Sequence, residues 1–538
     1  MFKFLNSQLL KLNYFSLFSI ILIIYGTTLA LFSVAGFPDS LQGGFFPFLT
    51  DKPLNEDGFY MIKVAWNIAN NNGISYYNGE PTTGIQPLIT FFYSLICWVF
   101  IHFFDSNKWI LLRFLILVGV ISHILFAYLI GLLTIKLNND DQKNKLAFNI
   151  SSAITLFSFG LFRQSTQGLE TTFYLCGLSY LLIFLIDNCK KGKSLGLNKV
   201  FKLGLLSSLL VLIRIDALII LFFIYLIIFL KRKLKFIDAL VVFFLTSILV
   251  SPWFAYVFKV TGKIVPSSGG SQSALINFEM LGERIDISTK ALVSHSVSIF
   301  TIGREFLFLG SLSLLCIYIL LILLSKSVRI KISHLFKNDI FYAFFASFII
   351  LFLTYFISSD AKHFYYRYFS PFVILSIPLL GISIAEIYTF KKIYIYLFSL
   401  SLFTMQTIGS LHAGRVGNTH AVSAGYIANN FNSQEFIVGS FQSGVIGFFN
   451  DNVINLDGKL DHKSLRALSV SKKNKNFDEL INYINLRNIN VIIDWNGYVE
   501  NCFRKLIESP DWEYCKDAIN NKHGNVQSVC IRKNMEKI

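Results

Sequence analysis

The stretch LNYFSLFSIILIIYGTTLALFSVAGFP, residues 12–38, contains no charged side chain. About 20 consecutive apolar residues suffice for a helix to cross a bilayer, so this stretch predicts a transmembrane span. It follows Lys3 and Lys11 as the core of a signal peptide would, but it is too long for one and predicts an uncleaved anchor. Similar stretches recur along the 538 residues, of which 54% are hydrophobic and 15% charged. Because soluble domains carry about 25% charged residues, the chain is predicted to be a polytopic membrane protein.

The apolar stretches predict about eleven spans, at residues 13–35, 109–135, 146–162, 171–187, 200–213, 216–230, 236–258, 300–325, 340–357, 370–389 and 393–411. Residues 86–104 are apolar but short, and counting them as a crossing would put the lysine-rich loops at 188–199 and 231–235 outside. If residues 86–104 are an interfacial or re-entrant segment, every basic loop lies in the cytoplasm, in agreement with the positive-inside rule. The N-terminus is then cytoplasmic and loop 36–108 external. The net charge of +16 reflects the cytoplasmic loops and not a nucleic-acid partner.

The residues after 411 are more polar than the rest of the chain. Short apolar runs at 435–439 and 490–494 predict buried strands, and 478–486 predicts a helix leading into the second of them. This alternation predicts a small α/β domain over residues 412–538, separate from a membrane domain over residues 1–411. The three cysteines of the tail have no metal-binding spacing, and a disulfide among them is compatible with an oxidising compartment: Cys502, Cys515 and Cys530.

The first external loop contains the stretch EDGFYMIKVAWNIANNNGISYYNGEPTTG, residues 56–84. Its apolar residues recur at helical spacing, as Phe59, Ile62, Trp66 and Ala69, and the opposite face carries Tyr60, Lys63, Asn67 and Asn70. The spacing predicts an amphipathic helix that lies in the membrane interface with its apolar face down. Adjacent acids at its N-terminus, Glu56 and Asp57, are equally compatible with helix capping and with a chemical role.

This stretch resembles the first-loop signature of GT-C glycosyltransferases, polytopic enzymes that use polyprenyl-phosphate sugars. Later elements match the pattern of that family in order: QGLETT at 167–172, LIRID at 212–216, SPW at 251–253 with GKIVPS at 262–267, and YRYFSP at 366–371. Ile215 replaces the proline of the family's Arg-Pro-Asp element. The tail around GSFQSGVIG, residues 439–447, resembles the family's extracytoplasmic C-terminal domain.

The resemblance implies a mainly α, polytopic GT-C protein of a bacterial inner membrane, with its C-terminal α/β domain outside. It implies transfer of a sugar from a polyprenyl-phosphate donor, held among membrane lipid, to an extracytoplasmic glycan, lipid or protein acceptor, with inversion. Such a transfer needs a base for the acceptor hydroxyl and cations for the departing phosphate. Asp57 would be the base. Glu56 would position substrate or share a divalent cation, Mg or Mn, with Asp57, and Glu170 would be a second acid.

The remaining expected substrate-binding residues are Lys63, Arg214, Asp216, Arg367 and His363. Arginine suits a phosphate because its fork donates two hydrogen bonds at once. Simpler interpretations stay open, since arginines at span ends commonly reach toward the interface, Asp216 follows Arg214 closely enough to pair with it, and Glu170 precedes a span as a cap would.

Two other functions also stay open. A lipid-linked sugar transporter or flippase would carry charged groups at mid-membrane and often internal repeats, whereas the polar clusters here gather at one face. A non-catalytic membrane assembly protein would have the fold without any catalytic activity. The sequence has no P-loop, GxGxxG or Gly-x-Ser-x-Gly motif, which disfavours an NTPase or an α/β-hydrolase.

Overall fold

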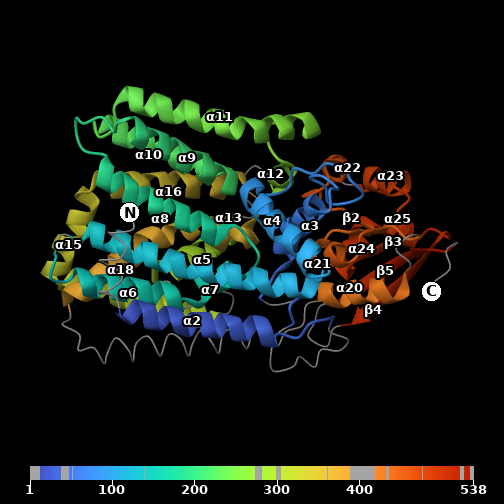
Figure 1. Cartoon of the computed structure of the whole chain (residues 1–538). Coiled ribbons are helices and arrows are strands. Elements are labelled where there is room, and N and C mark those ends of the chain that lie inside the picture. The colour runs from blue at the N-terminus through green and yellow to red at the C-terminus, as the bar shows by residue number, and fades with distance from the viewer. Residues whose placement is uncertain are drawn as a thin grey trace.

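A long helical bundle makes up most of the molecule, and a small sheet with its own helices lies at one end of it (Figure 1). The computed structural model describes residues 13–37, 48–50, 53–138, 140–272, 281–297, 305–359, 361–387, 419–431, 435–474, 476–520 and 526–533. The bundle is built from α2 (Asn13–Phe32), α5 (Lys108–Leu137), α6 (Asn144–Phe157), α7 (Phe159–Thr166), α8 (Thr171–Asn188), α9 (Leu197–Ile213), α10 (Ala217–Leu230), α11 (Phe236–Thr261), α13 (Leu281–Val297), α14 (Glu305–Leu324), α15 (Lys326–Lys337), α16 (Asp339–Ser358) and α18 (Val373–Ile387).

Five helices of the described part are long and apolar enough to cross a membrane: α5, α8, α11, α16 and the run Lys362–Ile387 that ends with α18. The pair α6 and α7, bent by 57° at its break, makes a sixth if it is one span. The chain is thus a membrane protein, but the predicted count of eleven spans is not confirmed by the described residues. The predicted span at 393–411 and the predicted domain boundary after residue 411 lie outside them.

The basic loops gather at the end of the bundle that is farthest from the sheet (Figure 1). The loop after α8 meets the loop after α10, where the Gly192 amide donates to the Arg232 carbonyl over 2.9 Å. Lys233 pairs with Asp339 at 3.2 Å in the same layer. One end of the bundle therefore carries the lysine-rich loops and the other carries the C-terminal sheet, which is the separation that the charge pattern predicted.

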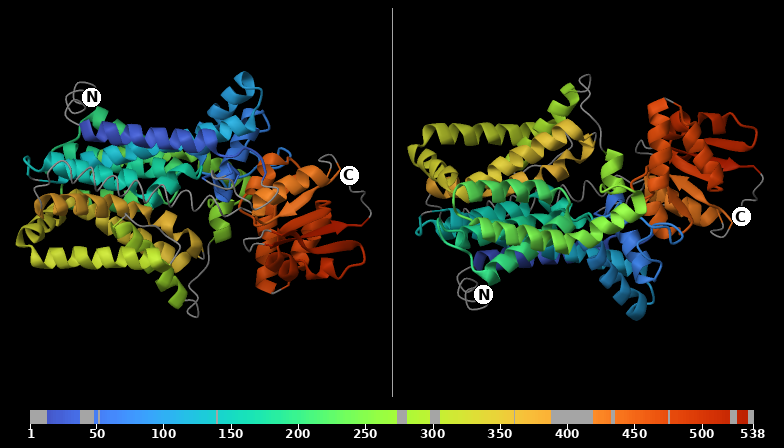
Figure 2. Two further views of the ribbon diagram at one scale, coloured as in Figure 1. Left: turned by 90° about the horizontal axis from the view of Figure 1, so that it is seen from below. Right: turned by 90° about the horizontal axis from the view of Figure 1, so that it is seen from above.

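The predicted first-loop helix is present as α3 (Glu56–Ala69), but its environment differs from the expected one. Both its apolar face and three residues of its polar face are buried, namely Tyr60, Lys63 and Asn67. The helix does not lie with one face open to water, because α4 (Pro87–Phe103) packs on one side and α21 (Gly444–Phe449) on the other. Helix α4 itself projects from the side of the bundle (Figure 2).

The C-terminal sheet has five strands in the order β2-β1-β3-β5-β4. The parallel strands are β2 (Val453–Asn455), β1 (Val438–Ser440) and β3 (Val491–Trp495), and the antiparallel pair is β5 (Val526–Arg532) and β4 (Trp512–Asn520). Strand β1 overlaps the end of the strand predicted at 435–439, β3 matches the strand predicted at 490–494 to within one residue, and α23 (Asp478–Leu486) coincides with the predicted helix. Cys502 and Cys530 are free thiols, so no disulfide forms among the three cysteines of the tail.

Candidate active site

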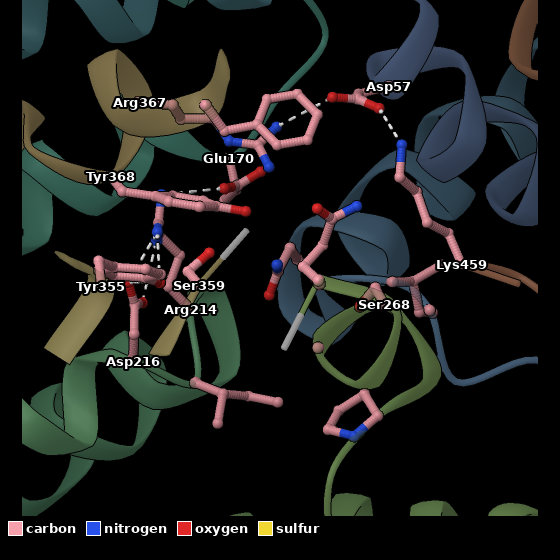
Figure 3. A pocket seen from close by; sticks show the side chains of 18 of the residues that line it. Asp57, Glu170, Arg214, Asp216, Ser268, Tyr355, Ser359, Arg367, Tyr368 and Lys459 are labelled. Atoms are coloured by element: carbon pink, nitrogen blue, oxygen red, sulfur yellow. Dashed lines mark hydrogen bonds and ion pairs between the residues drawn. The ribbon is translucent and has the colours of Figure 1, made fainter. Parts of the chain in front are cut away.

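A cavity of about 580 Å³ lies where the bundle meets the C-terminal part of the chain. Side chains from distant segments line it, and Figure 3 shows its charged groups converging from several elements. Three carboxylates and three cations face this one space: Asp57, Glu170 and Asp216 with Arg214, Arg367 and Lys459. The structure thus brings together five of the residues singled out in the sequence and adds Lys459.

Asp57 stands in the first turn of α3, with its carboxylate directed into the cavity. The helix cap is supplied by Asn55, whose side chain accepts from the Gly58 amide over 2.8 Å. Asp57 is therefore not needed as the cap. Its Oδ1 lies 3.3 Å from Lys459 Nζ and its Oδ2 lies 3.6 Å from an Arg367 nitrogen. Burial would raise the pKa of Asp57, but these two cations outweigh it and hold that pKa below its ordinary value.

The first loop and the turn before α8 fit closely at Gly58. A Cβ atom on this glycine would lie 2.1 Å from the Gln167 carbonyl oxygen, so only glycine allows this approach. The Asn55 amide also donates to that carbonyl, over 3.4 Å. This contact brings the QGLETT turn, and Glu170 with it, beside Asp57.

Arg214 is the centre of a buried ion cluster. Its guanidinium donates from Nε and NH2 to both carboxylate oxygens of Asp216, over 3.0 and 2.6 Å, and its NH1 lies 3.3 Å from Glu170 Oε1. The Tyr355 hydroxyl donates to Asp216 over 2.7 Å. Glu170 and Asp216 occupy the cap positions of α8 and α10, but neither side chain caps its helix, because both carboxylates are directed to Arg214.

Arg367 is less completely satisfied than Arg214. Its Nε is buried and has no hydrogen-bond partner among the described residues. Its guanidinium carbon lies 4.8 Å from the centre of the Phe364 ring and 5.4 Å from that of Tyr368. Aromatic faces hold a cation in place without using its hydrogen-bond donors. Arg367 therefore keeps donor capacity for an anion in the cavity.

Lys459 is the functional residue that sequence reasoning missed. It follows Gly458, whose φ of +78° marks a tight turn, and it lies 14% exposed between Asp57 and Asp457. The first loop positions it through Gly84, where a Cβ atom would lie 1.7 Å from the Lys459 carbonyl oxygen. The Ser267 hydroxyl donates to that same carbonyl over 2.7 Å. Nothing local in the sequence indicated this contact, because the partners are hundreds of residues apart.

Three predicted residues do not line the cavity. The Glu56 carboxylate accepts from the backbone amides of Gly444 and Val445 at the start of α21. Lys63 is buried against Asp451 in a separate hollow. His363 precedes the cavity residue Phe364, with 4.0 Å between the two ring centres. Glu56 and Lys63 are paired with groups outside the cavity, so direct contact of their side chains with a substrate held there is not supported. The substrate contact expected of His363 stays a prediction.

The carboxylates of Glu56 and Asp57 do not fit the expected divalent cation. They face different partners, since Glu56 accepts amide hydrogens from α21 and Asp57 pairs with two side-chain cations. Within the part of the chain that the structure describes, no group of three or more His, Cys, Asp or Glu side chains is placed to hold a metal ion. The positive charge beside Asp57 comes instead from Lys459 and Arg367.

The buried Glu56 carboxyl predicts a pH-dependent stability. Burial raises its pKa from 4.5 to about 7, although the amides of Val445 and Gly444 oppose the rise. Between these two pH values the folded protein holds a proton that the unfolded chain has released. Stability therefore falls as the pH rises through this window. We expect the apparent Tm of the detergent-solubilised protein to fall by a few degrees between pH 4.5 and about pH 7. In Glu56→Gln the Tm should depend less on pH over the same range.

The control for this prediction is Glu80→Gln, which alters an acid that pairs with Arg487 outside the α21 contact. This variant should keep the slope of the wild type between pH 4.5 and pH 7. An equal slope in wild type and Glu56→Gln would contradict the assignment.

The Arg214 cluster predicts a large loss of stability in Arg214→Met. Its removal leaves Glu170 and Asp216, 2% and 13% exposed, without their cation. Breaking a buried ion pair costs about 3–5 kcal/mol, because a charge stays buried and unpaired. Thermal unfolding in detergent measures the change. Arg504→Met, at an arginine that is 80% exposed, is the control and should cost less than about 1 kcal/mol. Equal unfolding temperatures of Arg214→Met and Arg504→Met would contradict the prediction.

Comparison with known proteins gives matches in structure alone. No protein-family model matches the chain, and no curated protein does. Among solved structures, ArnT from Cupriavidus metallidurans bound to undecaprenyl phosphate is similar, with a TM-score of 0.52 at 10% identity over 95% of this chain and 97% of that one. The apo state of the same protein gives a TM-score of 0.53 at 12% identity, with the same coverage of both chains.

An oligosaccharyltransferase from Archaeoglobus fulgidus, in complex with Zn and sulfate, gives a TM-score of 0.51 at 13% identity over 95% of this chain and 73% of that one. The chain has the GT-C fold. At such identities the likeness shows the fold alone.

Proposed function

We propose that this GT-C protein is an integral-membrane glycosyltransferase. It moves a sugar from a polyprenyl-phosphate donor to an extracytoplasmic glycan, lipid or protein acceptor. The observation that carries the proposal is the single cavity in which Asp57 faces Arg367 and Lys459 while the opposite wall is apolar. A donor of this class has the same two parts, an anionic phosphate and a hydrocarbon chain.

The apolar wall suits the lipid chain of the donor. It is lined by Ile215, Leu218, Ile219, Val265 and Pro266. Leu218 and Val265 are 42% and 54% exposed, so this wall continues to the outer surface of the bundle. In a membrane protein such a surface is in contact with lipid, and a polyprenyl chain can reach the cavity from there without crossing water.

The phosphate of the donor is assigned to Arg367 and Lys459. Arg214 already donates to Glu170 and Asp216, whereas Arg367 retains an unused Nε donor among the described residues. Arg367 and Lys459 now neutralise Asp57, and a phosphate that binds them draws their charge away from that carboxylate. The basicity of Asp57 then rises at the moment when the donor is in place.

The transfer is a single displacement at the anomeric carbon of the sugar. The acceptor oxygen forms a bond to this carbon as the bond from carbon to the phosphate oxygen breaks, and its electron pair passes to the phosphate. Asp57 takes the proton of the acceptor hydroxyl. Arg367 and Lys459 stabilise the charge that develops on the leaving phosphate. The products are polyprenyl phosphate and the glycosylated acceptor, with inverted configuration.

We place this chemistry on the outer side of a bacterial inner membrane, with the N-terminus in the cytoplasm. The supporting observation is the separation of the basic loops from the C-terminal sheet at opposite ends of the bundle. Positive loops stay in the cytoplasm, so the cavity, which adjoins the sheet, opens outside.

The test is release of polyprenyl phosphate by the purified protein in liposomes that contain synthetic polyprenyl-phosphate sugars and membrane glycolipid acceptors. The proposal expects release that depends on both donor and acceptor. A transporter would move the intact donor across the liposome membrane and release no polyprenyl phosphate, and that outcome would overturn the proposal. Comparing the glycans of a deletion strain with those of its parent then identifies the acceptor.

A further inference from the structure

A second hollow, of about 690 Å³, lies between the first external loop and the C-terminal sheet. Helix α3 contributes Lys63, Trp66 and Asn67, the segment that follows contributes Asn70, Asn72, Tyr76, Tyr77, Asn78 and Gly79, and the tail contributes Ile437, Asp451 and Asn452. No residue of this lining belongs to the charged cavity. The hollow is therefore a separate site with its own chemistry.

The lining is rich in amides and aromatic rings and nearly neutral. Lys63 and Asp451, its two charged residues, pair with each other. Asn452 is 7% exposed, and its Oδ1 is buried without a hydrogen-bond partner among the described residues. An unsatisfied buried acceptor is costly unless a ligand or water supplies a donor.

Internal hydrogen bonds hold the lining of the hollow in place. The Asn67 side-chain amide donates to the carbonyls of Ser75 and Tyr76, over 3.0 and 3.1 Å, which fixes the loop against α3. The Tyr76 hydroxyl donates to the Ser443 carbonyl and so ties the loop to the tail. Asn78 adopts a positive φ of 43°, a conformation that asparagine tolerates better than most residues. A site assembled in this way presents its polar groups without reorganising on binding.

These features select the class of ligand. Amides both donate and accept, as sugar hydroxyls require, and the half-buried ring of Tyr77, with the guanidinium carbon of Arg487 5.6 Å from its centre, adds an aromatic surface for the C–H side of a sugar. A phosphate or nucleotide would need unpaired cations, and a lipid chain would need an apolar wall. We propose that the hollow binds a neutral oligosaccharide that forms part of the acceptor.

The placement along α3 supports this assignment, which rests on the proposed function. Asp57 and Asn67 lie ten residues apart on one helix, which corresponds to about 15 Å at 1.5 Å per residue. A single sugar cannot occupy the hollow and reach Asp57. The acceptor of this protein is therefore a chain of sugars, bound at a distance from the end that reacts.

The test measures binding of three neutral trisaccharides, maltotriose, mannotriose and chitotriose, to the full-length protein in nanodiscs by saturation-transfer NMR. We expect wild type and Tyr77→Phe, which retains the ring, to bind at least one of them equally. Tyr77→Ala should weaken that binding by about fivefold to tenfold, the usual value of an aromatic contact. Tyr498→Ala, at a tyrosine of the tail that does not line the hollow, is the matched control and should bind as wild type.

Asn70→Trp provides a second variant should Tyr77→Ala fail to fold. Residue 70 is exposed at the end of α3, and an indole there fills the hollow without disturbing the core, so binding should be lost. Binding of none of the three trisaccharides, or equal binding by wild type and Asn70→Trp, would overturn the proposal. Binding of the neutral peptide Gly-Ser-Asn-Ser-Gly in place of the trisaccharides would also overturn the proposal.

The outcomes separate this site from the catalytic proposal. Asp57→Asn should bind the trisaccharide as wild type does, whereas Tyr77→Ala should raise KM for an oligosaccharide acceptor in the transfer assay. Trisaccharide binding without any release of polyprenyl phosphate would refute the transferase and leave the sugar site standing. Normal transfer by Tyr77→Ala with an unchanged KM would refute the sugar site and leave the transferase standing.

Discussion

Asp57→Asn is expected to lose transfer activity by about a hundredfold to ten-thousandfold, the usual contribution of a positioned base. Asparagine has the same shape and still accepts hydrogen bonds from Lys459 and Arg367, but it cannot take the acceptor proton. Because Asn55 caps α3, the substitution leaves the start of the helix intact. The protein should therefore reach wild-type abundance in the membrane, and the loss should lie in kcat.

Glu80→Gln is the matched control for Asp57→Asn. Glu80 belongs to the same loop as Asp57 but pairs with Arg487 and Lys463 away from the cavity, so the activity of the variant should be that of wild type. The measurement is polyprenyl phosphate released per mole of folded protein. Activity within about threefold of wild type in Asp57→Asn would eliminate Asp57 as the base, since such a change is below the contribution of a base.

Lys459→Gln is expected to have the second large effect, on both the rate and its pH dependence. The variant loses a charge beside the leaving phosphate, and loss of one such interaction costs about a hundredfold to a thousandfold in kcat. Lys459 is also the largest of the influences that lower the pKa of Asp57. Its removal should raise that pKa, so the acid limb of the pH–rate profile moves to higher pH.

Two further variants separate the charge of Lys459 from its packing. Lys459→Arg keeps the cation and should retain the pH profile of wild type. Lys463→Gln changes a lysine of the same segment that is 54% exposed and pairs with Glu80, and it should leave both rate and profile unchanged. A slow Lys459→Gln variant with an unshifted acid limb would show that Lys459 acts through structure and not through charge.

Much of the cavity could be predicted because its residues stand at helix ends. Glu170 precedes α8, Arg214 and Asp216 lie between α9 and α10, and Arg367 precedes α18. Charged side chains at the ends of apolar runs are visible in a sequence, and the positive-inside rule assigns these ends to one face. The pairing of Asp216 with Arg214 also followed from their spacing, and the structure confirms it.

The contacts between the bundle and the tail could not be predicted. Glu56 turns from the cavity to α21, and Lys63 is buried although it lies on the polar face of α3, because residues 444–452 cover that helix. Burial of a polar face by a segment almost 400 residues away leaves no periodic pattern. Lys459 was missed for the same reason. The predicted number of spans is not confirmed by the described residues, in which five helices, or six with the bent pair, are long and apolar enough to cross a membrane.

The close packing of the Lys459 carbonyl against Gly84 has a consequence for biogenesis. A ribosome completes every described helix of the bundle before residue 459 is made, and in the proposed topology this residue must then cross the membrane and dock. Until it does, Asp57 lacks one of its two cations and the phosphate lacks one of its partners. Under the proposed function, a nascent chain that is already inserted among lipid-linked sugars would thus be inert and could not hydrolyse them before its last segment has folded.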